Sequence, residues 1–189
     1  MPGIDQPSDT TAALPAGTVT FLLTDIEGST RLWESDPDAM ARAVSAHYVV
    51  LSNAVGRHRG VRPVEQGEGD SVVAAFARAS DAVAAALEAQ LALTSEALPG
   101  GLELRVRMAL HATEAQVRDE GNYVGVGLSR CARLRGLAHG GQILLSRAVH
   151  DLVADRLPEG ACWWTSEPID CVTSGVPSTC SRSIIRIYR

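Results

Sequence analysis

The order of the hydrophobic patterns along the chain is the feature that most restricts its fold. Residues 19–23 form a short apolar run rich in β-forming side chains, which predicts a buried strand. Apolar residues then recur at spacings of three and four from Met40 to Val55, after Asp36 and Pro37. This pattern predicts a long amphipathic helix with an aspartate at its N-cap and a proline in its first turn. The chain therefore begins as a strand followed by a helix.

The later patterns continue this alternation of strands and helices. Residues 102–110 alternate apolar and charged side chains, as in a strand with one face in water. Gly67 and Gly69 tolerate positive φ, so residues 67–69 are expected to form a hairpin turn. We predict strands at 61–66, 71–77, 102–110 and 142–145, and helices at about 80–91, 126–138 and 147–154. The order predicts an α/β fold (an α+β sandwich) with a ferredoxin-like βαββαβ core and an additional C-terminal helix and strand.

Composition excludes several classes of protein. All 17 basic residues are arginine, and 22 acidic residues give the 189-residue chain a net charge of −5. This balance argues against direct binding of nucleic acid or of an acidic membrane. No apolar run reaches the ~20 residues of a membrane helix, and residues 1–16 lack the features of a signal peptide. We therefore expect a cytoplasmic protein of one domain, preceded by a flexible leader at residues 1–16.

Two carboxylates stand where predicted strands end or begin. Asp25 follows the first apolar run, and Asp70 follows the glycine-rich turn. In a ferredoxin-like sheet these strands are neighbours, so the two carboxylates can converge into a hard-oxygen site for Mg²⁺ or Mn²⁺. Taken alone, however, Asp25 could simply cap the next helix, and Asp70 could simply end a turn.

The segments around both aspartates favour the functional interpretation. Several of them match one known family in order and at compatible spacing: VTFLLTDIEGSTRLWE, VEQGEGDSVVAAF, LHATEAQVRD, GNYVGVGLSRCARL and HGGQILLS. Over residues 17–160 the chain resembles the class III nucleotidyl (adenylyl/guanylyl) cyclase catalytic domain. It looks most like the actinobacterial branch found at the N-terminus of multidomain LuxR-type or ATPase transcriptional regulators.

The resemblance implies a two-metal site and a reaction. Asp25 and Asp70 match the metal-binding aspartates of the family, and the Ile26 carbonyl matches a further metal ligand. Two Mg²⁺ or Mn²⁺ ions would activate the ribose 3′-hydroxyl of ATP or GTP. Attack on the α-phosphorus would release pyrophosphate and leave a 3′,5′-cyclic nucleotide.

Four more positions match functional residues of the family. Gln66 and Asn122 occupy the positions that read the base, while Ser129 and Arg133 occupy those that stabilise the transition state. In the family the active site is shared across a homodimer. Gln66 and the aspartates would therefore come from one chain, and Asn122, Ser129 and Arg133 from the other.

Two departures from the family pattern predict weak activity. Gln66 and Asn122 are amides, which present either a donor or an acceptor and discriminate adenine from guanine poorly. Ser129 replaces an asparagine, and loss of one transition-state donor typically costs ~10²–10³ in rate. The alternative is a catalytically degenerate cyclase-homology domain that binds nucleotide or dimerises as a regulatory module.

The tail, residues 161–189, departs from the family altogether. It has no clear hydrophobic period, and Cys162, Cys171 and Cys180 lack the spacing and the histidines of a zinc site. Back-translation with GC-rich codons and a shifted frame permits the sequence LVDLGADRLRDLGRPEHVLAVDHPDLP, which closely resembles the usual ending of this domain. We therefore interpret the tail as frame-shifted and expect the chain to derive from a longer ancestor.

Overall fold

A mixed sheet flanked by helices organises the chain. The computed structural model describes residues 13–64, 69–95, 101–119, 121–156, 161–165, 169–173, 176–180 and 183–187. The strands are β1 (Gly17–Ile26), β2 (Val72–Phe76), β3 (Val106–Asp119), β4 (Asn122–Val124), β5 (Ile143–Leu145), β6 (Ala161–Thr165), β7 (Ile169–Thr173), β8 (Val176–Cys180) and β9 (Ser183–Ile187). The helices are α1 (Ser29–Ser35), α2 (Pro37–Arg57), α3 (Ala79–Ser95), α4 (Val126–Arg135) and α5 (Arg147–Val153). The predicted α+β class is confirmed.

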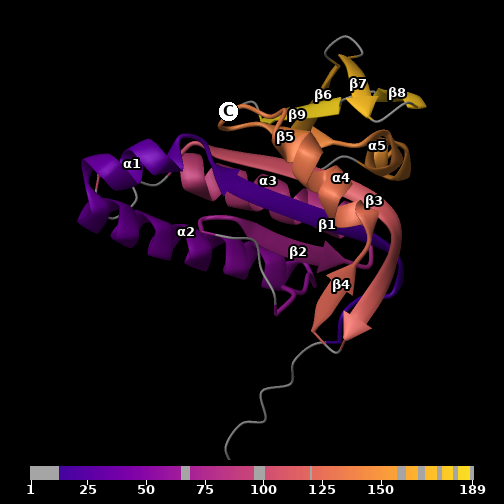
Figure 1. The fold of residues 1–189 in the computed structure, drawn as a ribbon, viewed down its shortest axis with the longest axis horizontal. Coiled ribbons are helices and arrows are strands. Elements are labelled where there is room, and N and C mark those ends of the chain that lie inside the picture. Colours follow the sequence, from indigo (N-terminus) through magenta and orange to yellow (C-terminus); the bar gives the residue numbers. More distant parts are fainter. Residues whose placement is uncertain are drawn as a thin grey trace, which may run out of the picture.

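Strand β1 lies between β2 and β3 near one side of the sheet, whose order is β2-β1-β3-β5-β9-β6 (Figure 1). It runs antiparallel to both neighbours, whereas β5 runs parallel to β3. Thr24 pairs with Val72 of β2, and Asp25 pairs with Arg107 of β3. The last residues of β1 therefore lie beside the first residues of both neighbouring strands.

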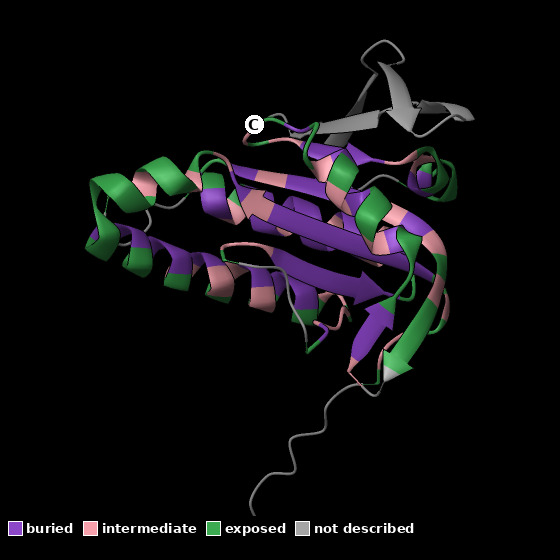
Figure 2. Cartoon of the chain, viewed as in Figure 1, coloured by how far each residue is buried: buried purple, intermediate pink, exposed green. Residues whose placement is uncertain are grey.

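The two faces of the sheet bury different helices. Leu22 and Ile26 belong to one apolar core with residues of α2, α3 and α5. Phe21 and Leu23 belong to a second core with residues of α4. Figure 1 shows α4 in front of the sheet and α3 behind it, and Figure 2 shows the strands between them as almost wholly buried. Because side chains alternate along a strand, Asp25 falls on the face covered by α4.

Helix α2 begins as the sequence predicts. The Asp36 carboxylate accepts a hydrogen bond from the Ala39 amide at 2.9 Å, and Pro37 opens the first turn. Met40 and Leu51 are fully buried against the sheet. Within the portion of the chain that the structure describes, no helix is long and apolar enough to span a membrane.

The predicted strand at 61–66 is not a strand in its described part. Only Val61 pairs with the sheet, through an isolated bridge to Ala75, while residues 62–64 form no ladder and residues 65–68 lie outside the described residues. Pro63 explains part of the difference, because it has no amide hydrogen for a ladder. The 102–110 strand also differs, since it begins at Val106 and continues to Asp119, where it pairs with β4.

The backbone of the tail forms strands that the sequence did not reveal. β9 pairs with the free edge of β5, and β6 pairs with β9, so both extend the main sheet. β7 and β8 form a separate two-stranded ladder. An unpaired edge strand offers backbone donors and acceptors to any segment that can lie extended beside it, whatever its hydrophobic period. The shifted reading frame stays a prediction, which the nucleotide sequence of the gene tests.

Candidate active site

The carboxylates singled out in the sequence lie at one end of the sheet. Asp70, two residues before β2, accepts a hydrogen bond through Oδ2 from the backbone amide of Ile26 at 2.6 Å. Asp25 is the preceding residue on β1, and its side chain is 15% exposed. The antiparallel register of β1 and β2 thus brings Asp25, Ile26 and Asp70 together.

Asp25 is paired with two arginines. Arg107, its cross-strand neighbour on β3, donates from Nε to Oδ1 at 2.7 Å and from Nη2 to Oδ2 at 2.6 Å. Arg135 of α4 places its Nε 3.3 Å from Oδ2 of the same carboxylate. The hydrogen bonds to Asp25 raise the pKa of the Arg107 guanidinium above its ordinary value. Both carboxylate oxygens of Asp25 therefore lie against positively charged guanidinium groups.

Arg135 also connects α4 to the ends of β1 and β2. Its Nη1 donates to the carbonyl of Thr24 at 3.1 Å and to the hydroxyl of Ser71 at 2.6 Å. The Ser71 hydroxyl in turn donates to the same Thr24 carbonyl at 3.0 Å. These contacts anchor the guanidinium independently of Asp25.

The turn that carries Asp70 is held by α2. The Tyr48 hydroxyl donates a hydrogen bond to the Gly69 carbonyl, and the Arg62 guanidinium lies 5.7 Å from the centre of the Tyr48 ring. His47 is fully buried beside this group, and neither of its ring nitrogens has a hydrogen-bond partner among the described residues. Burial lowers the pKa of His47 to about 4, against a smaller opposing effect of Asp70.

The other predicted site residues that the structure describes do not join this cluster. Ser129 and Arg133 are exposed on α4, and Arg133 makes no hydrogen bond or ion pair with any residue the structure describes. Arg133 and Arg135 are two positions apart on α4, about 200° around the helix axis, so their side chains leave the helix in nearly opposite directions. Asn122 is buried on β4, and Gln66 lies outside the described residues.

The donor atoms fit a divalent cation of the hard class. Two carboxylates and the Ile26 carbonyl are oxygen ligands of the kind that Mg²⁺ and Mn²⁺ prefer. Among the described residues no group of three or more His, Cys, Asp or Glu side chains could hold a metal ion. The set therefore fits ions that share their coordination with a bound ligand or water, provided that Arg107 releases Asp25.

Sequence reasoning missed Arg107 and Arg135. Arg107 belongs to the charged positions of the alternating strand, which indicated a water-facing side. Only the register of β1 against β3 shows that this side faces Asp25.

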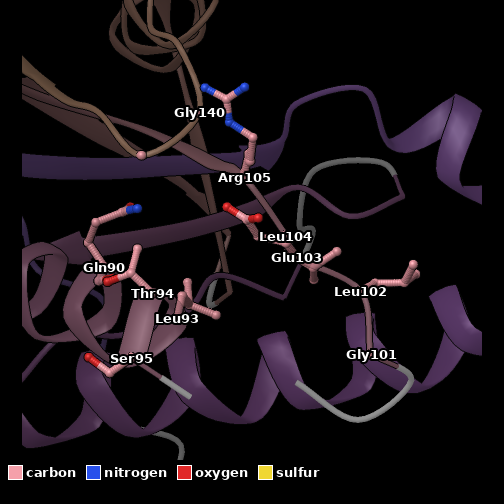
Figure 3. Close-up of a pocket in the computed structure, with 11 residues that line it drawn as sticks. Gln90, Leu93, Thr94, Ser95, Gly101, Leu102, Glu103, Leu104, Arg105 and Gly140 are labelled. Carbon is pink, nitrogen blue, oxygen red and sulfur yellow. The ribbon is translucent and has the colours of Figure 1, made fainter. Parts of the chain in front are cut away.

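A pocket of about 350 Å³ lies elsewhere, between the end of α3 and the loops at 101–105 and 140–141 (Figure 3). Gln90, Thr94 and Arg105 contribute polar groups to its wall, and none of the predicted site residues within the described ranges lines it. Arg105 also lies 3.5 Å from the Glu27 carboxylate.

This architecture is the class III nucleotidyl cyclase fold. An adenylate cyclase from Trypanosoma brucei superimposes with a TM-score of 0.78 at 25% identity, covering 93% of both chains. The guanylate cyclase domain from Catenaria anguillulae, solved with GTP, superimposes with a TM-score of 0.72 at 14% identity, covering 92% of this chain and 98% of that one.

Sequence relatives agree with the fold. An uncharacterized protein of Mycobacterium tuberculosis is 50% identical over 157 residues, which are 83% of this chain and 52% of the relative. An adenylate cyclase of Lachancea kluyveri is 32% identical over 158 residues, 71% of this chain and 8% of that protein. The chain thus spans about half the length of its mycobacterial relative, and no family model matches it. Together these likenesses support a class III adenylyl or guanylyl cyclase catalytic domain.

Proposed function

We propose that the chain is a nucleotidyl cyclase that converts ATP or GTP to a 3′,5′-cyclic nucleotide and pyrophosphate. The observation that carries the proposal is the convergence of Asp25 and Asp70 at the end of β1, within a cyclase fold. The guanylate cyclase neighbour holds GTP, which supports a nucleoside triphosphate as the substrate here.

The aspartates and the Ile26 carbonyl would hold two Mg²⁺ or Mn²⁺ ions with the nucleotide. When bound, such ions lower the pKa of the ribose 3′-hydroxyl and neutralise phosphate charge. Asp25 and Asp70 supply the negative charge that binds cations at this strand end. The hydrogen bond from the Ile26 amide to Oδ2 orients the Asp70 carboxylate, whose Oδ1 would act as a ligand.

The second half of the site comes, in this proposal, from another copy of the chain. Ser129 and Arg133 are exposed on the outer side of α4 and do not reach Asp25 of their own chain. A homodimer would bring them to the partner's nucleotide, where Arg133 would stabilise charge on the phosphates and Ser129 would donate a hydrogen bond. Gln66 from one chain and Asn122 from the other would read the base.

The test is direct. We would incubate the purified chain with Mn²⁺ and either ATP or GTP and measure cyclic nucleotide, beside an Asp25→Ala control. Product above that control is the expected result. If the parent chain forms no more product than the Asp25→Ala control, the proposed enzymatic activity is refuted. The alternative then stands, a degenerate module that binds nucleotide or dimerises.

A further inference from the structure

A bidentate ion pair occupies Asp25, one of the proposed metal ligands. Arg107 donates to both oxygens of Asp25 at 2.6–2.7 Å, and Arg135 approaches one of them at 3.3 Å. The Arg107 side chain is 25% exposed, that of Arg135 is 20% exposed and that of Asp25 is 15% exposed. A bidentate pair that is largely withheld from water is much stronger than an ordinary surface pair.

We propose that Arg107 and Arg135 form an arginine clamp on Asp25, which competes with divalent cations for this carboxylate and so sets the affinity of the site for them. This inference rests on the proposed function, because it takes Asp25 to be a cation ligand. A cation gains Asp25 only when Arg107 leaves it, so the energy of the Arg107 pair opposes cation binding. Arg107 therefore competes with the cation for Asp25.

The two arginines differ in what else holds them. Arg135 stays attached through the Thr24 carbonyl and the Ser71 hydroxyl when Asp25 is removed from it. Among the described residues, the Arg107 side chain donates hydrogen bonds only to Asp25, so it can leave Asp25 without breaking another of these hydrogen bonds. Arg107 is thus the movable half of the clamp and Arg135 the fixed half.

The neighbourhood offers a charge-matched control. Arg105 stands two residues before Arg107, is 60% exposed and faces Glu27 at 3.5 Å without touching Asp25. Replacing either arginine by glutamine changes the net charge equally, but only the Arg107 change frees Asp25. Comparing the two variants therefore separates the specific pair from the general electrostatic field.

The experiment titrates Mn²⁺ into the nucleotide-free full chain and measures free Mn²⁺ by electron paramagnetic resonance. Arg107→Gln should bind Mn²⁺ about tenfold more tightly, a change of ~1.4 kcal/mol. Arg105→Gln should change the affinity by less than about twofold, because exposed charges are screened. Arg107→Lys keeps the charge but cannot form the bidentate pair, so this variant should bind Mn²⁺ about threefold more tightly than the parent chain. The lysine variant also provides the test if the glutamine variant fails to fold.

Two results would overturn the inference, and they are distinguishable. Unchanged or weaker Mn²⁺ binding in both Arg107 variants, with binding abolished by Asp25→Asn, would show that Arg107 does not compete with the cation, while the proposed metal site would stand. Unchanged binding in Asp25→Asn would remove Asp25 from the cation site and contradict the proposed function as well.

Discussion

Replacing Asp70 by asparagine and by alanine separates its structural contact from its proposed role as a metal ligand. Its carboxylate accepts the Ile26 amide at 2.6 Å, and Ile26 is 2% exposed. A hydrogen bond to a charged acceptor contributes ~1.5–3 kcal/mol, and its loss leaves a buried donor unpaired. Asp70→Ala should therefore lower the free energy of unfolding by ~2 kcal/mol, which for a chain of this size is about 4–8 °C in Tm.

Asp70→Asn should cost less, about 1 kcal/mol, because the amide oxygen still accepts from Ile26. Both variants should lose Mn²⁺ affinity alike, since both remove the charge. Urea unfolding and calorimetry measure the first effect, and Mn²⁺ titration measures the second. Asp155, which is exposed, supplies the matched control: its replacement by asparagine or alanine should stay within about 0.5 kcal/mol. Equal destabilisation by Asp70→Asn and Asp70→Ala would show that hydrogen-bond acceptance does not stabilise this strand end.

Three further predictions concern packing, pH and rate. An added Cβ at Gly60 would lie 2.4 Å from the Phe76 ring, so Gly60→Ala should destabilise the chain by ~1–3 kcal/mol in urea unfolding, whereas Gly56→Ala meets open space and should not. The pKa of His47 is about 4 when folded and ~6.5 when unfolded, so stability should fall by about 3 kcal/mol as pH drops from 6.5 to 4. His47→Leu should flatten that dependence in urea titrations at each pH; the same slope as the parent chain would refute the assignment. If the chain turns over, Ser129→Asn should raise kcat at least about tenfold in the cyclic-nucleotide assay, and an unchanged rate would contradict the role of that position.

The sequence predicted those parts of the fold that depend on local patterns. Three features can be inferred from residues that lie close together in the sequence. They are the Asp36 cap, the apolar stripe of α2 and the apolar run of β1. The strand expected at 61–66 depended on pairing with a neighbour, and only Val61 pairs in its described part. The tail strands were not predicted because they depend on pairing with the free edge of β5. The spacing of apolar residues within the tail does not encode that pairing.

The candidate site was likewise predictable only where it depends on local sequence patterns. Asp25 and Asp70 were predicted to converge because both stand at the ends of neighbouring strands, and the hydrogen bond between Asp70 and Ile26 follows from that register. Arg107 and Arg135 lie on β3 and α4, which are far from Asp25 in the sequence. Their contact with Asp25 depends on the β1–β3 register and the packing of α4, which the sequence does not display.

The central claim, a cyclase site shared between two copies of the chain, is tested most directly by complementation. Asp25→Ala and Arg133→Ala should each lack activity with Mn²⁺ and ATP or GTP. When the two inactive variants are mixed in equal amounts, half of the dimers should be mixed and each should contain one intact site, so about a quarter of the parent activity should return. Activity in the parent chain with no recovery in the mixture would contradict the shared site.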